Sequence, residues 1–118
     1  MEIRERFLGS VVCLDVKGRL VVTNDNERLT EKVIRLLFEN HKNIILNFEE
    51  VSQVDTSGLS ALVSVSLAVE RGGGKIKLLN LPPRIHDLLI LTRLITLFEV
   101  VDSEPDAVRA FSLEAGVQ

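Results

Sequence analysis

The hydrophobic residues of this chain fall into short runs that are separated by polar or glycine-rich turns. Some runs are rich in β-branched residues, which is typical of strands in a sheet. Others repeat an apolar residue every three or four positions, which is typical of helices with one buried face. The expected strands are residues 10–16, 20–22, 44–48, 75–79 and 97–101. The expected helices are residues 24–40, 57–71 and 83–91, and a last one that begins near residue 103.

Glycine, proline and capping residues mark several of the expected boundaries. Gly72-Gly73-Gly74 follows the second helix and predicts its end, and Pro82-Pro83 predicts the start of the third. Asn24, with Glu27 three residues later, predicts a capping box at the start of the first helix. Ser103 is expected to begin the last helix.

Two further segments are expected to be irregular. Lys17-Gly18-Arg19 lies between two strand-like runs, which predicts a tight turn and an antiparallel hairpin. Residues 49–54 are largely polar and are expected to form a connector between the strand before them and the helix after them.

The order of these elements is strand, strand, helix, strand, helix, strand, helix, strand, helix. Such alternation predicts an α/β domain whose mixed sheet has an N-terminal antiparallel hairpin and later parallel strands joined by right-handed crossovers. About four helices would flank the sheet. The chain has 118 residues, close to the commonest domain size, so we expect one domain over residues 1–118.

Composition and charge exclude several classes of function. The 14 Lys and Arg residues against 17 Asp and Glu give a net charge of −3, without the basic excess that favours nucleic acid as a partner. No apolar run approaches the roughly 20 residues of a membrane span, and residues 1–6 alternate in charge, unlike a signal peptide. We therefore expect a cytoplasmic protein without direct membrane insertion. The lone Cys13 is expected to be a buried thiol.

The most conspicuous polar group is Asp55-Thr56-Ser57-Gly58, at the expected start of the second helix. In one interpretation Asp55 or Thr56 caps the helix and Gly58 permits close packing. In the other, a hydroxyl is exposed here, and the helix N-terminus would accommodate a phosphate placed on it. The neighbouring carboxylate of Asp55 would repel that phosphate.

Other chemistry has little support in the sequence. His41 and His86 lack further ligands at the spacing of a metal site. Gly72-Gly73-Gly74 follows a helix and has no Lys-Ser/Thr sequel, so it does not resemble a phosphate-binding loop. Ser57 lacks the glycine spacing of a nucleophile elbow. We therefore expect no cofactor, no metal and no enzymatic activity.

The run from Ile44 to Leu62 resembles the signature of the STAS domain (sulphate transporter and anti-sigma factor antagonist). In that signature an apolar strand and a short acidic connector precede an Asp-Ser/Thr-Ser/Thr-Gly-Leu loop that opens a helix. The hairpin with Gly18, the break at Gly72–Gly74 and the Leu-rich helix after Pro83 also stand where the family places them. A chain of this length is similar to the bacterial anti-sigma factor antagonists in particular.

The resemblance implies a non-enzymatic switch. An antagonist of this kind binds an anti-sigma factor that is also a serine kinase, which releases the sigma factor. Phosphorylation of the loop hydroxyl then ends the interaction until a serine phosphatase removes the phosphate. Carried over to this chain, the resemblance makes Ser57 the phosphoacceptor, with Thr56 as the alternative, and Asp55 the acidic residue of the motif. Gly58 is expected to let a partner backbone approach closely.

Helical spacing predicts that Ser60, Ser64 and Leu67 lie near the Ser57 side of the helix, as part of the partner-binding surface. One segment departs from the family pattern. Many antagonists carry a Gly-acidic-apolar-Asp sequence where this chain has Gly18-Arg19-Leu20-Val21, so the resemblance supports partner binding more strongly than phosphorylation. Two other functions stay open: a scaffold subunit of a bacterial stress-signalling assembly, or a cytoplasmic accessory subunit of a membrane transporter.

Overall fold

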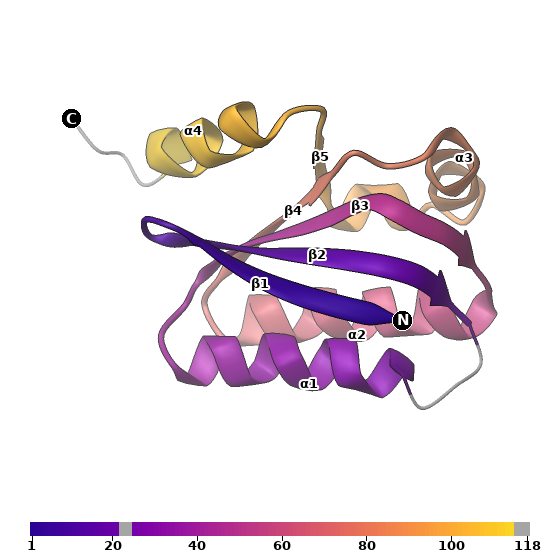
Figure 1. Ribbon diagram of the computed structural model, residues 1–118, viewed down its shortest axis with the longest axis horizontal. Coiled ribbons are helices and arrows are strands. Elements are labelled where there is room, and N and C mark those ends of the chain that lie inside the picture. Colours follow the sequence, from indigo (N-terminus) through magenta and orange to yellow (C-terminus); the bar gives the residue numbers. More distant parts are fainter. Residues whose placement is uncertain (22–24, 115–118) are drawn as a thin grey trace.

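The computed structural model describes residues 1–21 and 25–114, and its centre is a mixed five-stranded sheet in the order β1-β2-β3-β4-β5 (Figure 1). The first pair is antiparallel and the other three pairs are parallel, which confirms the expected fold class. The strands are β1 (Glu2–Leu8), β2 (Val11–Leu20), β3 (Asn43–Val54), β4 (Lys75–Leu79) and β5 (Glu99–Val101).

Helices cover both faces of this sheet. The described helices are α1 (Asp25–Phe38), α2 (Thr56–Arg71), α3 (Pro83–Leu91), the short 3-10 helix η1 (Leu94–Leu97) and α4 (Glu104–Glu114). Figure 1 shows α1 and α2 side by side under one face, α4 over the opposite face, and α3 beside the carboxyl end of β3. The main core lies between the sheet and α1, α2 and α3, whereas a smaller cluster beneath α4 includes Cys13 and Phe111.

The expected hairpin around Lys17–Arg19 is wrong. Val11–Leu20 is one continuous strand, and its antiparallel partner is Glu2–Leu8, a segment outside the strands expected from the sequence. Gly18 has a φ of 109°, a value that glycine adopts easily. It lies where the register between β2 and β3 shifts, so the glycine accommodates an irregularity within the strand instead of reversing the chain.

The expected connector over residues 49–54 is also wrong, because this segment continues β3. Its burial has a period of three: Phe48, Val51 and Val54 are buried, and the pairs of residues between them are exposed. A regular strand alternates every second residue. Two register shifts against β2 break that alternation here, which explains why the sequence resembled a loop.

Other boundaries agree with the sequence. α2 ends before Gly72–Gly74, β4 has the expected bounds, and α3 begins at Pro83. At the start of α4 the Ser103 hydroxyl accepts a hydrogen bond from the Asp106 backbone N–H at 3.2 Å, as expected for a cap. Of the capping box expected at Asn24 and Glu27, Asn24 lies outside the described residues, as does the side chain of Glu27.

An ion-pair cluster ties α4 to the sheet. The Arg6 guanidinium donates to both carboxylate oxygens of Asp15, at 2.5 and 2.9 Å, and to Glu104 Oε1 at 2.6 Å. Asn47 donates to the same Asp15 carboxylate at 2.9 Å. The hydrogen bonds from Arg6 hold the pKa of Asp15 below its ordinary value. Cys13 next to this cluster is fully buried, and burial raises its thiol pKa to about 12.

Candidate functional site

Asp55 caps the N-terminus of α2 and thereby fixes the loop that the sequence singled out. Its side-chain Oδ1 accepts a hydrogen bond from the Gly58 backbone N–H at 3.0 Å. Its own backbone N–H donates to the Leu20 carbonyl at 3.1 Å, and its carbonyl accepts from the Leu59 N–H at 2.9 Å. The loop is therefore attached both to the end of β2 and to the first turn of α2.

Gly58 is buried beneath the end of β2. A Cβ atom at this position would lie 2.3 Å from the Leu20 carbonyl oxygen and 2.9 Å from both Leu20 Cβ and Val54 Cγ1. The close approach that we expected between Gly58 and a partner backbone is therefore made within the chain, with Leu20. This glycine is explained by how it positions the loop.

The two hydroxyls between Asp55 and Gly58 lie in the first turn of α2. Thr56 is exposed and Ser57 is half-buried. The first turn of a helix carries N–H groups without partners inside the helix, and the helix dipole favours negative charge there. The helix dipole would stabilise the negative charge of a phosphate on either hydroxyl. The carboxylate of Asp55, one or two residues earlier in the sequence, would repel it.

The helix surface expected beside Ser57 is exposed. Ser60 and Ser64 face solvent, and the side chain of Leu67 is 44% exposed. The opposite side of the helix supplies the buried residues Ala61, Leu62, Val65 and Val69. We call the half-buried Ser57 together with the exposed Ser60, Ser64 and Leu67 the α2 face. The structure thus brings together the sequence-predicted residues of this face, whereas Gly58 is turned inward.

The positions that are acidic in many antagonists lie beside the loop. Arg19 pairs in register with Gln53 and is exposed, and Val21 follows the end of β2. Leu20, between them, is the residue that contacts Gly58 and Asp55. In this chain the segment Gly18–Val21 therefore carries the positive charge of Arg19, where many antagonists carry negative charges.

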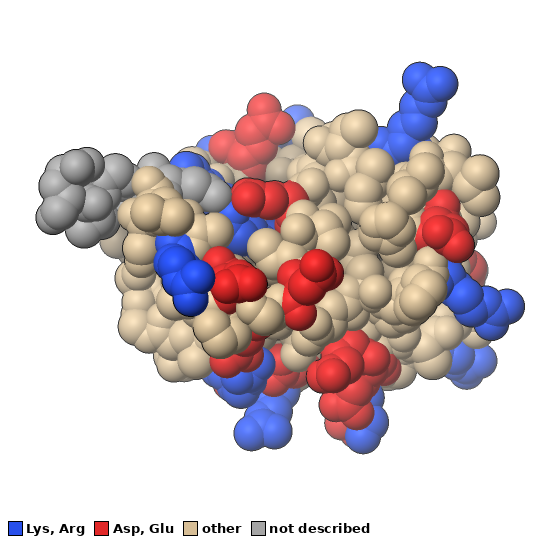
Figure 2. Space-filling view, turned by 90° about the horizontal axis from the view of Figure 1, so that it is seen from above, with Lys and Arg blue, Asp and Glu red and all other residues tan. Residues whose placement is uncertain are grey.

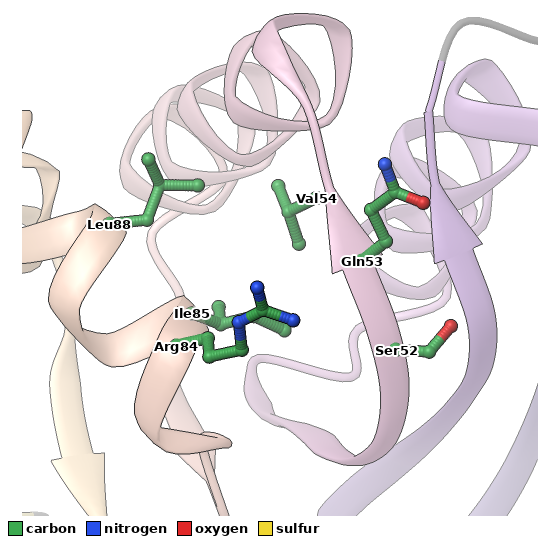
Figure 3. A pocket seen from close by; sticks show the side chains of 6 residues that line it. All are labelled: Ser52, Gln53, Val54, Arg84, Ile85 and Leu88. Carbon is green, nitrogen blue, oxygen red and sulfur yellow. The ribbon is translucent and has the colours of Figure 1, made fainter.

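A cavity near the loop was not expected from the sequence. It has a volume of about 350 Å³ and lies between α3 and the end of β3 (Figure 3). Its lining residues are Ser52, Gln53, Val54, Arg84, Ile85 and Leu88. The sequence carried no signal for it, because residues 52–54 resembled a connector and only the fold brings α3 beside them.

Neither a metal site among the described residues nor a basic platform on the face that carries α4 is found. In residues 1–21 and 25–114 no group of three or more His, Cys, Asp or Glu side chains is arranged to hold a metal ion. Figure 2 looks onto the side that carries α4, where the described acidic and basic side chains are interspersed and no continuous basic area is seen. None of the described helices is both long and apolar enough to cross a membrane.

The fold is shared with several solved structures. SpoIIAA, an anti-sigma factor antagonist solved in its unphosphorylated form, is 20% identical, with 98% of this chain and 100% of that chain covered and a TM-score of 0.71. SpoIIAA from Bacillus has also been solved in its phosphorylated form. A candidate anti-sigma factor antagonist from Thermotoga maritima is 20% identical, with 92% of each chain covered and a TM-score of 0.83.

A larger protein contains a similar region. The murine anion transporter Slc26a9 is 23% identical over 87% of this chain but only 18% of its own length, with a TM-score of 0.71. At such identities these likenesses establish the fold. The sequence itself matches the STAS domain family over residues 2–107. With nearly its whole length matched and with the mixed sheet, the four helices and the Asp55–Gly58 loop in place, this chain belongs to the STAS domain family.

Proposed function

We propose that this chain is an anti-sigma factor antagonist that works as a phosphorylation-controlled protein-interaction switch. In this proposal the α2 face and the Asp55–Gly58 loop bind an anti-sigma factor that is also a serine kinase, and a sigma factor is released. Phosphorylation of Ser57, or alternatively Thr56, ends the interaction, and a serine phosphatase restores it. The role places the chain in the cytoplasm and requires no catalytic step on it.

One observation carries the proposal. The Asp55 cap holds two adjacent hydroxyls at the start of α2, on a helix whose exposed side continues through Ser60, Ser64 and Leu67. Small polar residues with one leucine form a flat surface on which a partner can pack. Of the two hydroxyls, Ser57 is favoured because it directly precedes Gly58, as the resemblance to the family motif implies.

The expected effect of phosphorylation follows from charge. A phosphoserine adds about −1.5 to −2 charges, and burying such a charge in an interface without a partner is costly. Each ~1.4 kcal/mol of that cost lowers affinity tenfold. SpoIIAA, which shares the fold, has been solved in both phosphorylation states, and this supports a switch of the same type here.

The direct test is to isolate the partner and then map the modified residue. The tagged chain is purified from its native cell, bound proteins are identified by mass spectrometry, and the captured kinase is incubated with the chain and ATP. We expect one phosphate on the peptide that contains Ser57, and none on a Ser57→Ala variant. Ser64→Ala is the matched control and should be phosphorylated normally. A phosphate on Thr56 would select the alternative acceptor. A phosphate on neither residue, or none from a kinase active on another substrate, would contradict the assignment.

The similarity to part of an anion transporter favours one second candidate, a STAS subunit or domain that serves a membrane transporter. That function predicts co-purification with a membrane protein from detergent extracts. If the captured partner is a transporter and no kinase is found, this second candidate replaces the first. A large homo-oligomer would instead indicate the scaffold role.

A further inference from the structure

The carboxyl half of β3 has an open edge. On one side β3 pairs with β2 as far as Val54. On the other side β4 pairs only with Asn43–Asn47. Within the described residues, no strand therefore borders Phe48–Val54 on that second side. The N–H and C=O groups along such an edge are a ready template for pairing with another extended chain.

α3 lies beside this edge, and the cavity of about 350 Å³ separates the two elements (Figure 3). We call this cavity the β3–α3 groove. Its apolar lining consists of Val54 from the strand and Ile85 and Leu88 from the helix. A groove between a strand edge and a helix is a common shape for binding an extended peptide, because the strand supplies hydrogen bonds and the helix supplies side-chain contacts.

The side chains of Ser52 and Gln53 are directed away from α3. The Ser52 hydroxyl donates to the Gly18 carbonyl of β2 at 3.3 Å, so this side chain is directed away from α3. Figure 3 shows the side chain of Gln53 also directed toward β2, whereas Val54 points toward α3. Ser52 and Gln53 nevertheless line the groove, and we infer that they face it with their backbone.

The charge of the groove selects the kind of peptide. Arg84 is the one charged residue among those that line it. The exposed Glu49 and Glu50 belong to the same edge but do not line the groove, and Glu50 pairs with Lys17 of β2 at 3.8 Å. Arg84 is exposed, and among the described residues its guanidinium has no ion pair or hydrogen bond. Figure 3 shows it extending from α3 toward β3. An arginine in this position favours a carboxylate, which it can bind through two parallel N–H groups.

We propose that the β3–α3 groove binds an extended acidic segment of a protein partner, which adds to the open edge of β3 as a further strand. A carboxylate of that segment pairs with Arg84, and its apolar side chains contact Val54, Ile85 and Leu88. The groove ends at Val54, directly before Asp55, so the bound segment lies next to the proposed switch loop. The site is distinct from the α2 face and does not require phosphorylation of Ser57.

The test uses a synthetic peptide and the isotope-labelled chain. The probe is an acetylated and amidated pentapeptide, Glu-Val-Glu-Val-Glu, titrated while backbone amide signals are followed by NMR. We expect shifts concentrated in residues 48–54 and 83–88, and a clearly weaker response to the matched peptide with Lys in place of Glu. Arg84→Gln should raise the Kd about threefold to fivefold, the range of an exposed ion pair. Arg71→Gln removes the same charge at the far end of α2 and should leave the Kd unchanged.

A second pair of probes tests strand addition itself. In an extended peptide alternate N–H groups point to opposite sides, so only one set can pair with β3. We therefore compare two modified peptides, one N-methylated at both valine amides and the other N-methylated at the central glutamate amide. One of them should abolish the NMR shifts, and the other should preserve them. Tolerance of both would overturn strand addition. Shifts outside residues 48–54 and 83–88, or equal binding of the Lys peptide, would overturn the groove. Because Ser57 takes no part in this assay, either result is independent of the proposed switch.

Discussion

Gly58 lies directly beneath Leu20: a Cβ atom on the glycine would be 2.3 Å from the Leu20 carbonyl oxygen. The same carbonyl accepts the Asp55 backbone N–H. The end of β2 thus holds the start of α2 by a hydrogen bond and by a contact that leaves no room for a side chain. The candidate switch loop is therefore anchored to the core at Asp55 and Gly58, while Thr56 is exposed.

We expect Gly58→Ala to destabilise the domain by about 1–3 kcal/mol, because the added methyl group forces the backbone of β2 and α2 apart. Gly58→Val should cost more. The free energy of unfolding in urea measures both. Ser60→Ala, an exposed position two residues along the helix, is the control and should change stability by less than about 0.5 kcal/mol. A Gly58→Ala protein as stable as the unmodified chain would show that the helix start can shift.

Asp55→Ala should lower stability by about 0.5–2 kcal/mol, since it removes the acceptor for the Gly58 N–H. Asp55→Asn keeps a side-chain oxygen at the same place and should retain most of that stability. Thermal melting compares the two variants. Equal losses for both would mean that the charge of Asp55, and not its capping hydrogen bond, stabilises the loop.

Ser57→Asp should weaken binding of the kinase-type partner by at least about tenfold, or ~1.4 kcal/mol, while the fold stays intact. The carboxylate suits the helix N-terminus but adds charge to the interface. Isothermal titration measures the affinity, and circular dichroism checks the fold. Ser57→Asn is the matched control, because it has a similar size without the charge. Unchanged affinity for a folded Ser57→Asp protein would reject the switch.

Acid should destabilise the domain partly through Asp15. Its pKa is lowered in the folded chain, mainly by the hydrogen bonds from Arg6. The folded state therefore gains stability above the pKa of the unfolded carboxyl, and this gain is lost as pH falls through the lower, folded pKa. Melting temperatures from pH 7 down to pH 2 should fall less steeply for Asp15→Asn than for the unmodified chain. Glu31→Gln, at an exposed position of α1, should leave the slope unchanged.

Cys13 should resist alkylation in the native protein. Burial keeps its pKa at about 12, so almost no thiolate is present at pH 8, and the sulfur is inaccessible. Incubation with iodoacetamide followed by mass spectrometry should show an unmodified chain without denaturant and full modification in 6 M guanidinium. Rapid native labelling would instead reveal local opening beneath α4.

The sequence alone determined the elements whose limits are set by neighbouring residues. α2 ends before Gly72–Gly74, β4 begins directly after these glycines, and α3 begins at Pro83. At these residues the boundaries follow from local backbone restrictions. The sequence also located the Asp55–Gly58 loop, because hydroxyls and an acidic cap at a helix start form a local pattern. The α/β order followed from the same short-range signals.

Tertiary structure decided what depends on residues far apart in the chain. Pairing with β1 and β3 makes Lys17–Arg19 continue as part of β2 instead of forming a turn. The register shifts between β2 and β3 break the alternation of buried and exposed residues over 49–54, so this part of the strand resembles a loop in the sequence. That Gly58 faces Leu20, and that Arg84 comes to the open edge of β3, follows only from packing. The spacing of residues along one helix or strand indicates which of them share a face. Which other element packs against that face depends on the whole fold.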